Sequence, residues 1–226
     1  MARRSVPRLD GGTETEATLS ETRRLIFERL KAALGGLADK KPLPDYPADV
    51  AVSLGARVPG DPVARFCQSL EAVRGRAFTD PAALGAWLKE QRATRGYCDP
   101  ALIGWLTTAL GDGLTLESTL VRERIDDYQF GITRARGAVA ETGSLILDDA
   151  TTSRRLGALA PWIHVAVVTP ERILPDVGSA IAALGDDPNV IFCTGPSKTA
   201  DVEGILIEGV HGPGEQVALI HLFGAP

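Results

Sequence analysis

The sequence predicts an α/β domain with a mostly parallel, twisted sheet and helices on both faces. Three observations lead to this prediction. Helical patterns of about 10–12 residues alternate with short apolar segments, as they do in βαβ units. One such segment, 162–168, is apolar except for His164, which is typical of a strand buried on both faces. The 226 residues also include 24 glycines and 15 prolines, which indicates many tight turns between short elements.

The first 60 residues are expected to lie outside this domain. Residues 18–34 carry apolar side chains at helical spacing and are followed by two glycines, so a helix is predicted there. Five prolines lie within 42–62, which predicts an extended linker. We therefore assign an N-terminal helical arm with a Pro-rich linker to residues 1–60 and the α/β domain to residues 61–226.

The first half of the domain is expected to alternate between helices and short strands. Helical periodicity covers 63–73, 83–88 and 102–110, and short apolar pieces lie at 77–78 and 97–98. Asp80 and Pro81 precede the second helical pattern, where an N-cap and a first-turn proline are favoured. Residues 115–120 fit either a strand or the entry into a helix.

The second half predicts most of the sheet. Strands are expected at 128–132, 162–168, 189–194, 204–208 and 217–223, with a hairpin-like pair at 138–140 and 145–147. A helix is expected at 173–184, where a glycine follows its last residue.

Charge and hydropathy exclude two classes of partner. The formal net charge is −5 and the isoelectric point is near 5.3, so no basic surplus is present to neutralise the phosphates of a nucleic acid. No apolar run approaches the roughly 18 residues that cross a bilayer, so no membrane span is expected. No apolar segment follows the arginines near the N-terminus, as it would in a secretory signal, and we expect a cytoplasmic protein.

The cysteine pattern argues against a metal cofactor held by this chain. Cys67, Cys98 and Cys193 are far apart, and no CxxC pair occurs. The usual cysteine patterns that bind iron–sulfur clusters or zinc are therefore missing, and an odd cysteine count does not favour a disulfide framework. We expect no cofactor in this chain.

The sequence GPSKTADVE, beginning at Gly195, is the first candidate ligand site. It follows an expected strand, and open α/β sheets bind ligands at the carboxyl ends of their strands. Gly195 allows close backbone approach, while Ser197, Lys198 and Thr199 supply two hydroxyls and one cation. A helix that begins in this loop would also point backbone N–H groups at an anion. The alternative is a turn with a capping hydroxyl and Lys198 in solvent, and Asp201 reduces the positive charge.

The sequence GVHGP is the second candidate. Gly209 and Gly212 flank His211 in a tight loop, and a histidine can act as acid, base or ligand near neutral pH. A surface hydrogen-bonding role is the alternative. His164 and His221 lie within strand patterns, where a packing role is expected.

The sequence AETGS contains a candidate catalytic carboxylate. Glu141 stands between an apolar strand and a glycine turn, where burial would raise its pKa and suit a nucleophile or a general base. Thr142 and Gly143 complete that turn. The alternative is a hairpin turn in which Glu141 bonds nearby backbone N–H groups. Arg134 and Arg136 precede this segment and can bind a carboxylate or a phosphate, although exposed arginine is the commoner case.

These segments together resemble one known family, the LUD domain, and within it the lactate utilization protein C group. The resemblance covers roughly residues 60–226 and depends on the order of four segments: GIT at 131–133, AETGS at 140–144, GPSKTADVE at 195–203 and GVHGP at 209–213. It implies a fold like that of the NagB/RpiA/CoA-transferase superfamily. It also implies that the chain acts with two iron–sulfur partner proteins in oxidising L-lactate to pyruvate, with the clusters held by the partners.

The resemblance supplies no established catalytic residue, so the site is assigned from residue chemistry. Glu141 and His211 are the candidate catalytic residues, and the candidate ligand-binding residues are Thr142, Gly143, Gly195, Ser197, Lys198, Thr199, Asp201, Gly209 and Gly212.

Two functions follow as hypotheses. In the first, the chain is an accessory subunit of an iron–sulfur L-lactate oxidation system, and its pocket holds a small carboxylate, a phosphate or a nucleotide-like ligand. In the second, it is a stand-alone enzyme similar to a CoA transferase or a sugar-phosphate isomerase and uses Glu141. The turn from Glu141 to Gly143 resembles the Glu-Asn-Gly turn of CoA transferases, with Thr142 in place of asparagine.

Overall fold

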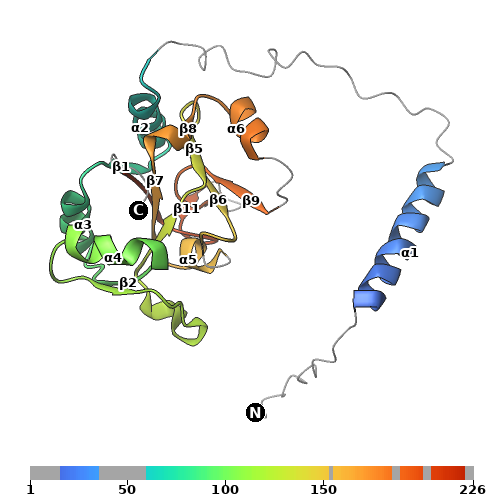
Figure 1. The fold of residues 1–226 in the computed structure, drawn as a ribbon, viewed down its shortest axis with the longest axis horizontal. Coiled ribbons are helices and arrows are strands. Elements are labelled where there is room, and N and C mark those ends of the chain that lie inside the picture. The colour runs from blue at the N-terminus through green and yellow to red at the C-terminus, as the bar shows by residue number, and fades with distance from the viewer. Residues whose placement is uncertain (1–15, 36–59, 153–154, 185–188, 201–204, 222–226) are drawn as a thin grey trace. The chain divides into compact units, whose positions relative to one another are not determined.

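The computed structural model describes residues 16–35, 60–152, 155–184, 189–200 and 205–221 (Figure 1). The chain divides into two units, Met1–Asp45 and Tyr46–Pro226. The linker expected within 42–62 lies almost wholly outside the described residues, so the boundary between 60 and 61 stays a prediction.

The described residues of the first unit form helix α1 (Glu16–Gly35), where the sequence predicts it. Arg24 and Glu28 form an ion pair at 3.6 Å across one turn of this helix. Its larger apolar side chains are about half exposed, and they are Leu25, Ile26, Phe27, Leu30 and Leu34.

The second unit contains the sheets. Its helices are α2 (Pro62–Ala72), α3 (Pro81–Glu90), α4 (Pro100–Ala109), α5 (Leu156–Leu159) and α6 (Val177–Leu184), with 3-10 helices η2 (Arg122–Asp127) and η3 (Pro170–Arg172). Its strands are β1 (Arg76–Phe78), β2 (Arg95–Cys98), β3 (Thr115–Glu117), β4 (Phe130–Arg134), β5 (Gly137–Val139), β6 (Ser144–Asp148), β7 (Ile163–Val168), β8 (Ile173–Leu174), β9 (Val190–Cys193), β10 (Lys198–Ala200), β11 (Leu206–Glu208) and β12 (Glu215–Ile220).

Three helices begin at an Asp-Pro pair, as the sequence predicts for α3. The aspartate carboxylate accepts a hydrogen bond from the backbone N–H two residues later, at 3.0 Å in α2, 3.0 Å in α3 and 2.8 Å in α4. Proline fits the first helical position because the N–H that it lacks has no intrahelical partner there. The three capping residues are Asp61, Asp80 and Asp99.

The six-stranded sheet is parallel throughout, in the order β1-β12-β7-β4-β2-β3. The chain moves outward from β2 to the edge strand β3. It then returns past β2 to β4 and continues in the opposite direction through β7 and β12. The direction of winding therefore reverses between β2 and β4, and such a reversal opens a crevice at the carboxyl ends of the two strands.

Helices and a second sheet cover both faces of this sheet, which confirms the predicted fold class (Figure 1). On one face, leucines of α3 and α4 pack against β4, β7 and β12. On the other face, α2, α5 and a four-stranded sheet in the order β8-β5-β6-β9 pack against the same strands. All six residues of β7 are buried, as expected of a central parallel strand covered on both sides.

One predicted element was wrong, and one predicted strand is present but lies in a different sheet than expected. Residues 173–184 do not form one helix, because Pro175 separates strand β8 from helix α6, and Asp176 accepts the N–H of Ser179 at 2.7 Å to start that helix. The strand expected at 189–194 exists as β9 but pairs antiparallel with β6 in the four-stranded sheet.

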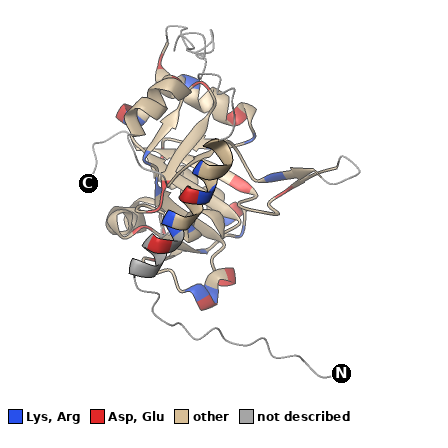
Figure 2. Ribbon diagram, turned by 90° about the vertical axis from the view of Figure 1, so that its right-hand side faces the viewer, with Lys and Arg blue, Asp and Glu red and all other residues tan. Residues whose placement is uncertain are grey.

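The pairing of β9 also changes the position of the loop that follows it. This loop does not lie at the carboxyl edge of the parallel sheet, and residues 198–200 form β10 rather than a helix start. β10 pairs with β11 in a two-stranded ribbon, which extends from the rest of the unit in Figure 2. Within the described residues, no helix is both long and apolar enough to cross a membrane.

Candidate functional site

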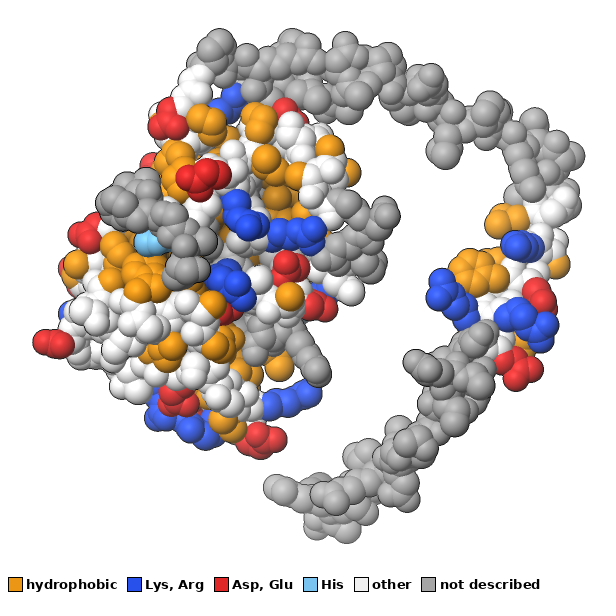
Figure 3. Space-filling model, viewed as in Figure 1, with side chains coloured by type: hydrophobic (Ala, Val, Ile, Leu, Met, Phe, Trp, Pro, Cys, Tyr) orange, Lys and Arg blue, Asp and Glu red, His pale blue; other side chains and the backbone are white. Residues whose placement is uncertain are grey.

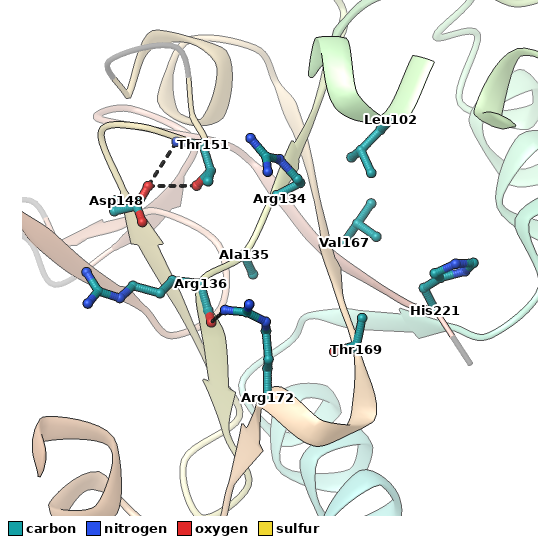
Figure 4. Close-up of a pocket in the computed structure, with 10 residues that line it drawn as sticks. All are labelled: Leu102, Arg134, Ala135, Arg136, Asp148, Thr151, Val167, Thr169, Arg172 and His221. Carbon is teal, nitrogen blue, oxygen red and sulfur yellow. Dashed lines mark hydrogen bonds between the residues drawn. The ribbon is translucent and has the colours of Figure 1, made fainter. Parts of the chain in front are cut away.

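A cavity of about 230 Å³ lies at the carboxyl ends of β4, β7 and β12 (Figure 4). Its polar lining comes from Arg134, Arg136, Asp148, Thr151, Thr169, Arg172 and His221, and its apolar lining from Leu102, Ala135 and Val167. Ligands of open α/β sheets bind at this edge. We call it the arginine cavity.

Arg134, the last residue of β4, is held by a buried carboxylate. Its Nε donates to Asp99 Oδ2 at 3.2 Å, and the Asp99 side chain is 5% exposed. Asp99 directly follows β2, and its other oxygen accepts the N–H of Ala101 to cap α4. Within the described part of the chain, no hydrogen bond occupies the terminal nitrogens of Arg134, so they are available to an anion.

The other two arginines are tied to backbone carbonyls. Arg136 donates through Nη2 to the carbonyl of Leu184 at 2.8 Å. Arg172, at the end of η3, donates through Nη1 to the carbonyl of Arg136 at 3.2 Å. Figure 4 shows the Arg172 side chain rising toward Arg136, whose own guanidinium points away from Arg134. Arg134 and Arg172 are therefore the two cations placed to meet a ligand in the cavity.

The cavity is positive although the chain is net negative. Among the described residues, Asp148 is the one carboxylate in its lining, and Asp148 Oδ1 already accepts two bonds from Thr151, from the N–H at 2.9 Å and from the hydroxyl at 2.8 Å. Basic side chains gather near the centre of the face shown in Figure 3, next to apolar surface. Arginines beside low-dielectric walls concentrate positive potential, which attracts anions.

His221 forms one wall of the cavity. It follows β12, and its N–H donates to the carbonyl of Val168 at 2.9 Å. Its ring stacks on Trp105 with centroids 4.6 Å apart. The packing role expected from the sequence is therefore present, but at the edge of a cavity rather than within a strand.

A second, more open cavity of about 530 Å³ lies next to the first and shares Arg134 with it. Tyr97, Asp99, Pro100, Ala101, Ser118, Thr119, Leu120 and Ala150 complete its lining. We call it the outer cavity.

The two glycine-rich candidate loops lie together, as the hypothesis of a shared site requires. Ser197 joins them: its N–H donates to the carbonyl of Pro213 at 2.8 Å, and its carbonyl accepts the N–H of Gly209 at 2.9 Å. The hydroxyl of Ser197 accepts the N–H of His211 at 3.3 Å. Gly212 packs against the same serine, and the His211 side chain is exposed.

Lys198 contacts the end of a helix. Its Nζ donates to the carbonyl of Val73, the C-cap residue directly after α2, at 3.2 Å. A cation at a helix C-terminus is favourable because the last carbonyls lack intrahelical partners. Gly195 has φ +73°, and a Cβ there would collide with the same carbonyl. Thr199 pairs with Ile207 in the ribbon, and Asp201 lies outside the described residues.

The Glu141 turn also has structural contacts. Glu141 Oε2 accepts the N–H of Val177 at the start of α6, at 3.4 Å. The hydroxyl of Thr142 lies 2.6 Å from that of Ser144, which is buried. Gly143 has φ +67°, and a Cβ there would collide with the backbone of α2. Among the described residues, none of those assigned as catalytic or ligand-binding from the sequence lines the arginine cavity or the outer cavity, whereas Arg134 and Arg136, considered as possible anion ligands, line the arginine cavity.

The comparisons with known proteins place this arrangement in a family. Residues 105–220 match the LUD domain, which is more than half of the chain. The chain belongs to the LUD domain family. The match extends from the second half of α4 to the end of β12 and so includes Arg134, Arg136 and Arg172.

Two relatives of this LUD domain chain share one name. The chain is 29% identical over 208 residues to lactate utilization protein C of Deinococcus radiodurans, an alignment that covers 87% of this chain and 95% of that protein. It is 32% identical over 105 residues to lactate utilization protein C of Oceanobacillus iheyensis, covering 43% of this chain and 44% of that protein. The second alignment thus spans less than half of its relative.

A solved structure shows the fold of this LUD chain independently. The crystal structure of a DUF162 family protein from Deinococcus radiodurans superposes with a TM-score of 0.50 at 21% identity. The superposition covers 70% of this chain and 95% of that one. At this identity the likeness bears on the fold alone.

Sequence reasoning found part of the arginine cavity of this LUD domain and missed the rest. Arg134 and Arg136 were identified as possible anion ligands, but Arg172, Thr169 and His221 were not. The available signal was position: Thr169 and His221 directly follow β7 and β12, two strands of the parallel sheet. Recognising it requires the strand order, which brings these ends together.

Proposed function

We propose that this chain takes part in lactate utilization and binds a small carboxylate or phosphate in the arginine cavity. The observation that carries the proposal is the position of Arg134 and Arg172 at the carboxyl edge of the parallel sheet, beside apolar Leu102 and Val167. The names of the Deinococcus and Oceanobacillus relatives support the lactate system as the setting.

The size and lining of the cavity suit a small organic acid. Its volume of about 230 Å³ lies below the range of about 300–1,000 Å³ that is usual for drug-sized ligands. Guanidinium groups pair with carboxylates and phosphates through two parallel hydrogen bonds. Leu102, Ala135 and Val167 offer an apolar wall for a short hydrocarbon part.

We further propose that the chain is an accessory, cytoplasmic subunit whose iron–sulfur clusters lie in partner proteins. In the described residues, no group of three or more His, Cys, Asp or Glu side chains is arranged to hold a metal ion. The three cysteines lie on separate elements, Cys67 in α2, Cys98 in β2 and Cys193 in β9.

The alternative, a stand-alone enzyme that uses Glu141 as nucleophile, has less support. The Glu141 carboxylate already accepts a helix-start N–H, and it lines neither of the two cavities. No observation in the described residues specifically favours a CoA-transferase or isomerase reaction over the small-anion site.

Two measurements test the proposal. The tagged chain is purified from lactate-grown native cells, and the eluate is examined for co-purifying iron–sulfur proteins and for lactate-dependent dye reduction. Separately, calorimetry measures L-lactate, pyruvate and phosphate binding to the purified chain, to Arg172→Gln and to the control Arg29→Gln on α1. Losing a charged hydrogen bond of about 1.5–3 kcal/mol should weaken binding by roughly 10- to 150-fold in Arg172→Gln alone. An iron-free, inactive eluate would refute the subunit role, and equal affinities of the two variants would refute the site.

A further inference from the structure

The outer cavity is built from the same segments as the arginine cavity. At the start of α4, Ala101 lines the outer cavity and Leu102 lines the arginine cavity. In the turn after β6, Ala150 lines the outer cavity and Thr151 lines the arginine cavity. Arg134 belongs to both. The two cavities are therefore neighbouring parts of one crevice, with Arg134 between them.

This crevice lies where the sheet reverses its winding. Asp99 follows β2 and Arg134 ends β4, and these two strands flank the reversal. Open α/β sheets bind elongated ligands across this point because the loops diverge to either side of it. A three-carbon acid held by Arg134 and Arg172 fills only one of the two sides.

The two sides differ in charge. The arginine cavity is cationic, whereas Asp99, the one carboxylate that the described residues contribute to the outer lining, pairs with Arg134 and also accepts the N–H of Ala101. The rest of the outer lining is uncharged, with exposed hydroxyls at Ser118 and Thr119. The outer cavity therefore suits an uncharged group that forms hydrogen bonds.

We propose that the crevice binds a nucleoside monophosphate, with the phosphate between Arg134 and Arg172 and the nucleoside in the outer cavity. The outer volume, about 530 Å³ against about 230 Å³, places the larger part of the ligand on the uncharged side. This inference rests on the proposed anion site and extends it. Because the phosphate and a small carboxylate use the same arginines, the two ligands compete.

Calorimetry on the full chain tests the proposal with four probes: inorganic phosphate, adenosine, AMP and L-lactate. AMP is expected to bind at least tenfold more tightly than phosphate, and adenosine more weakly than AMP, because joining two fragments removes the entropy cost of binding the second. L-lactate should displace AMP. Ala150→Trp fills the outer cavity and should reduce AMP affinity to that of phosphate while the phosphate affinity changes less than twofold. Ala83→Trp, at an exposed alanine of α3, is the matched control.

The outcomes separate this inference from the proposed function. If phosphate or L-lactate binds but AMP binds no more tightly, the nucleotide inference is wrong and the small-anion site stands. If AMP binds equally to wild type and Ala150→Trp, its nucleoside lies elsewhere and the inference is also wrong. If none of the four probes binds, the anion site itself fails. Should Ala150→Trp not fold, the milder double variant Ser118→Ala, Thr119→Val must lower AMP affinity without lowering phosphate affinity.

Discussion

Acidification is expected to destabilise the parallel sheet through one buried histidine. His164, the second residue of β7, is 1% exposed. Its Nε2 lies 2.8 Å from the Thr133 hydroxyl on β4, and its Nδ1 lies 2.9 Å from Gln216 Nε2 on β12. Burial is the main cause that lowers the pKa of His164 to about 4, while the Gln216 bond raises it slightly. The neutral ring is thus the form that the folded chain holds.

The magnitude follows from the difference in proton binding between the two states. The unfolded chain takes up the proton near pH 6.5, whereas the folded chain does so only near pH 4. Stability is therefore unaffected above pH 7 and falls as the pH drops through this window. One pKa unit corresponds to about 1.4 kcal/mol, so the loss is roughly 2 kcal/mol at pH 5 and about 3 kcal/mol at pH 4.

Urea unfolding at pH 8 and pH 5 measures this loss, with His164→Gln as the variant that keeps a neutral hydrogen-bonding side chain. Other groups titrate over the same range, so the relevant quantity is the pH-dependent difference between wild type and variant. His211→Gln, at an exposed histidine, is the control and should behave as wild type. A wild-type minus His164→Gln difference that stays constant between the two pH values would refute the reasoning.

Three further predictions use the same unfolding assay. Gly143→Ala should lower the free energy of unfolding by about 2–5 kcal/mol, because φ is +67° at this residue and a Cβ would collide with the α2 backbone. Gly104→Ala is the control, because its helical position has open space, and it should leave the free energy of unfolding unchanged or raise it. Asp99→Ala should lower the free energy of unfolding by about 2–3 kcal/mol and Asp80→Ala by about 1 kcal/mol, because both aspartates cap a helix but Asp99 also binds Arg134. Equal losses in the two variants would contradict that role of Asp99. Lys198→Met should lower the free energy of unfolding by about 0.3–1 kcal/mol and leave phosphate affinity unchanged. A loss of phosphate binding in this variant would show instead that the loop beginning at Gly195 belongs to the anion site.

The elements that the sequence predicts best are those with strong local signals. The Asp80-Pro81 pair is confirmed because a cap and a first-turn proline act within a few residues. The strand at 162–168 is confirmed as β7 because a continuous apolar run must be buried on both faces. Neither depends on a distant partner.

The placement of β9 and its loop shows where this reasoning stops. Val190–Cys193 is as apolar as a central parallel strand, but its partner is β6, about fifty residues earlier. Local pattern carries no information about pairing. The candidate loop was therefore assigned to the wrong sheet, and the residues that do meet at the parallel edge, Arg172 and His221, became visible only with the strand order.

Asp99 couples the start of helix α4 to the side chain of Arg134. A single carboxylate accepts hydrogen bonds from both the Ala101 amide and Arg134. An anion that pulls Arg134 away from Asp99 is therefore expected to change the strength of the hydrogen bond between Asp99 and the Ala101 amide. The rate at which the Ala101 amide exchanges its hydrogen with solvent thus becomes a reporter of occupancy in the crevice. Hydrogen exchange in the first turn of α4 is thus expected to differ between the empty and the occupied site.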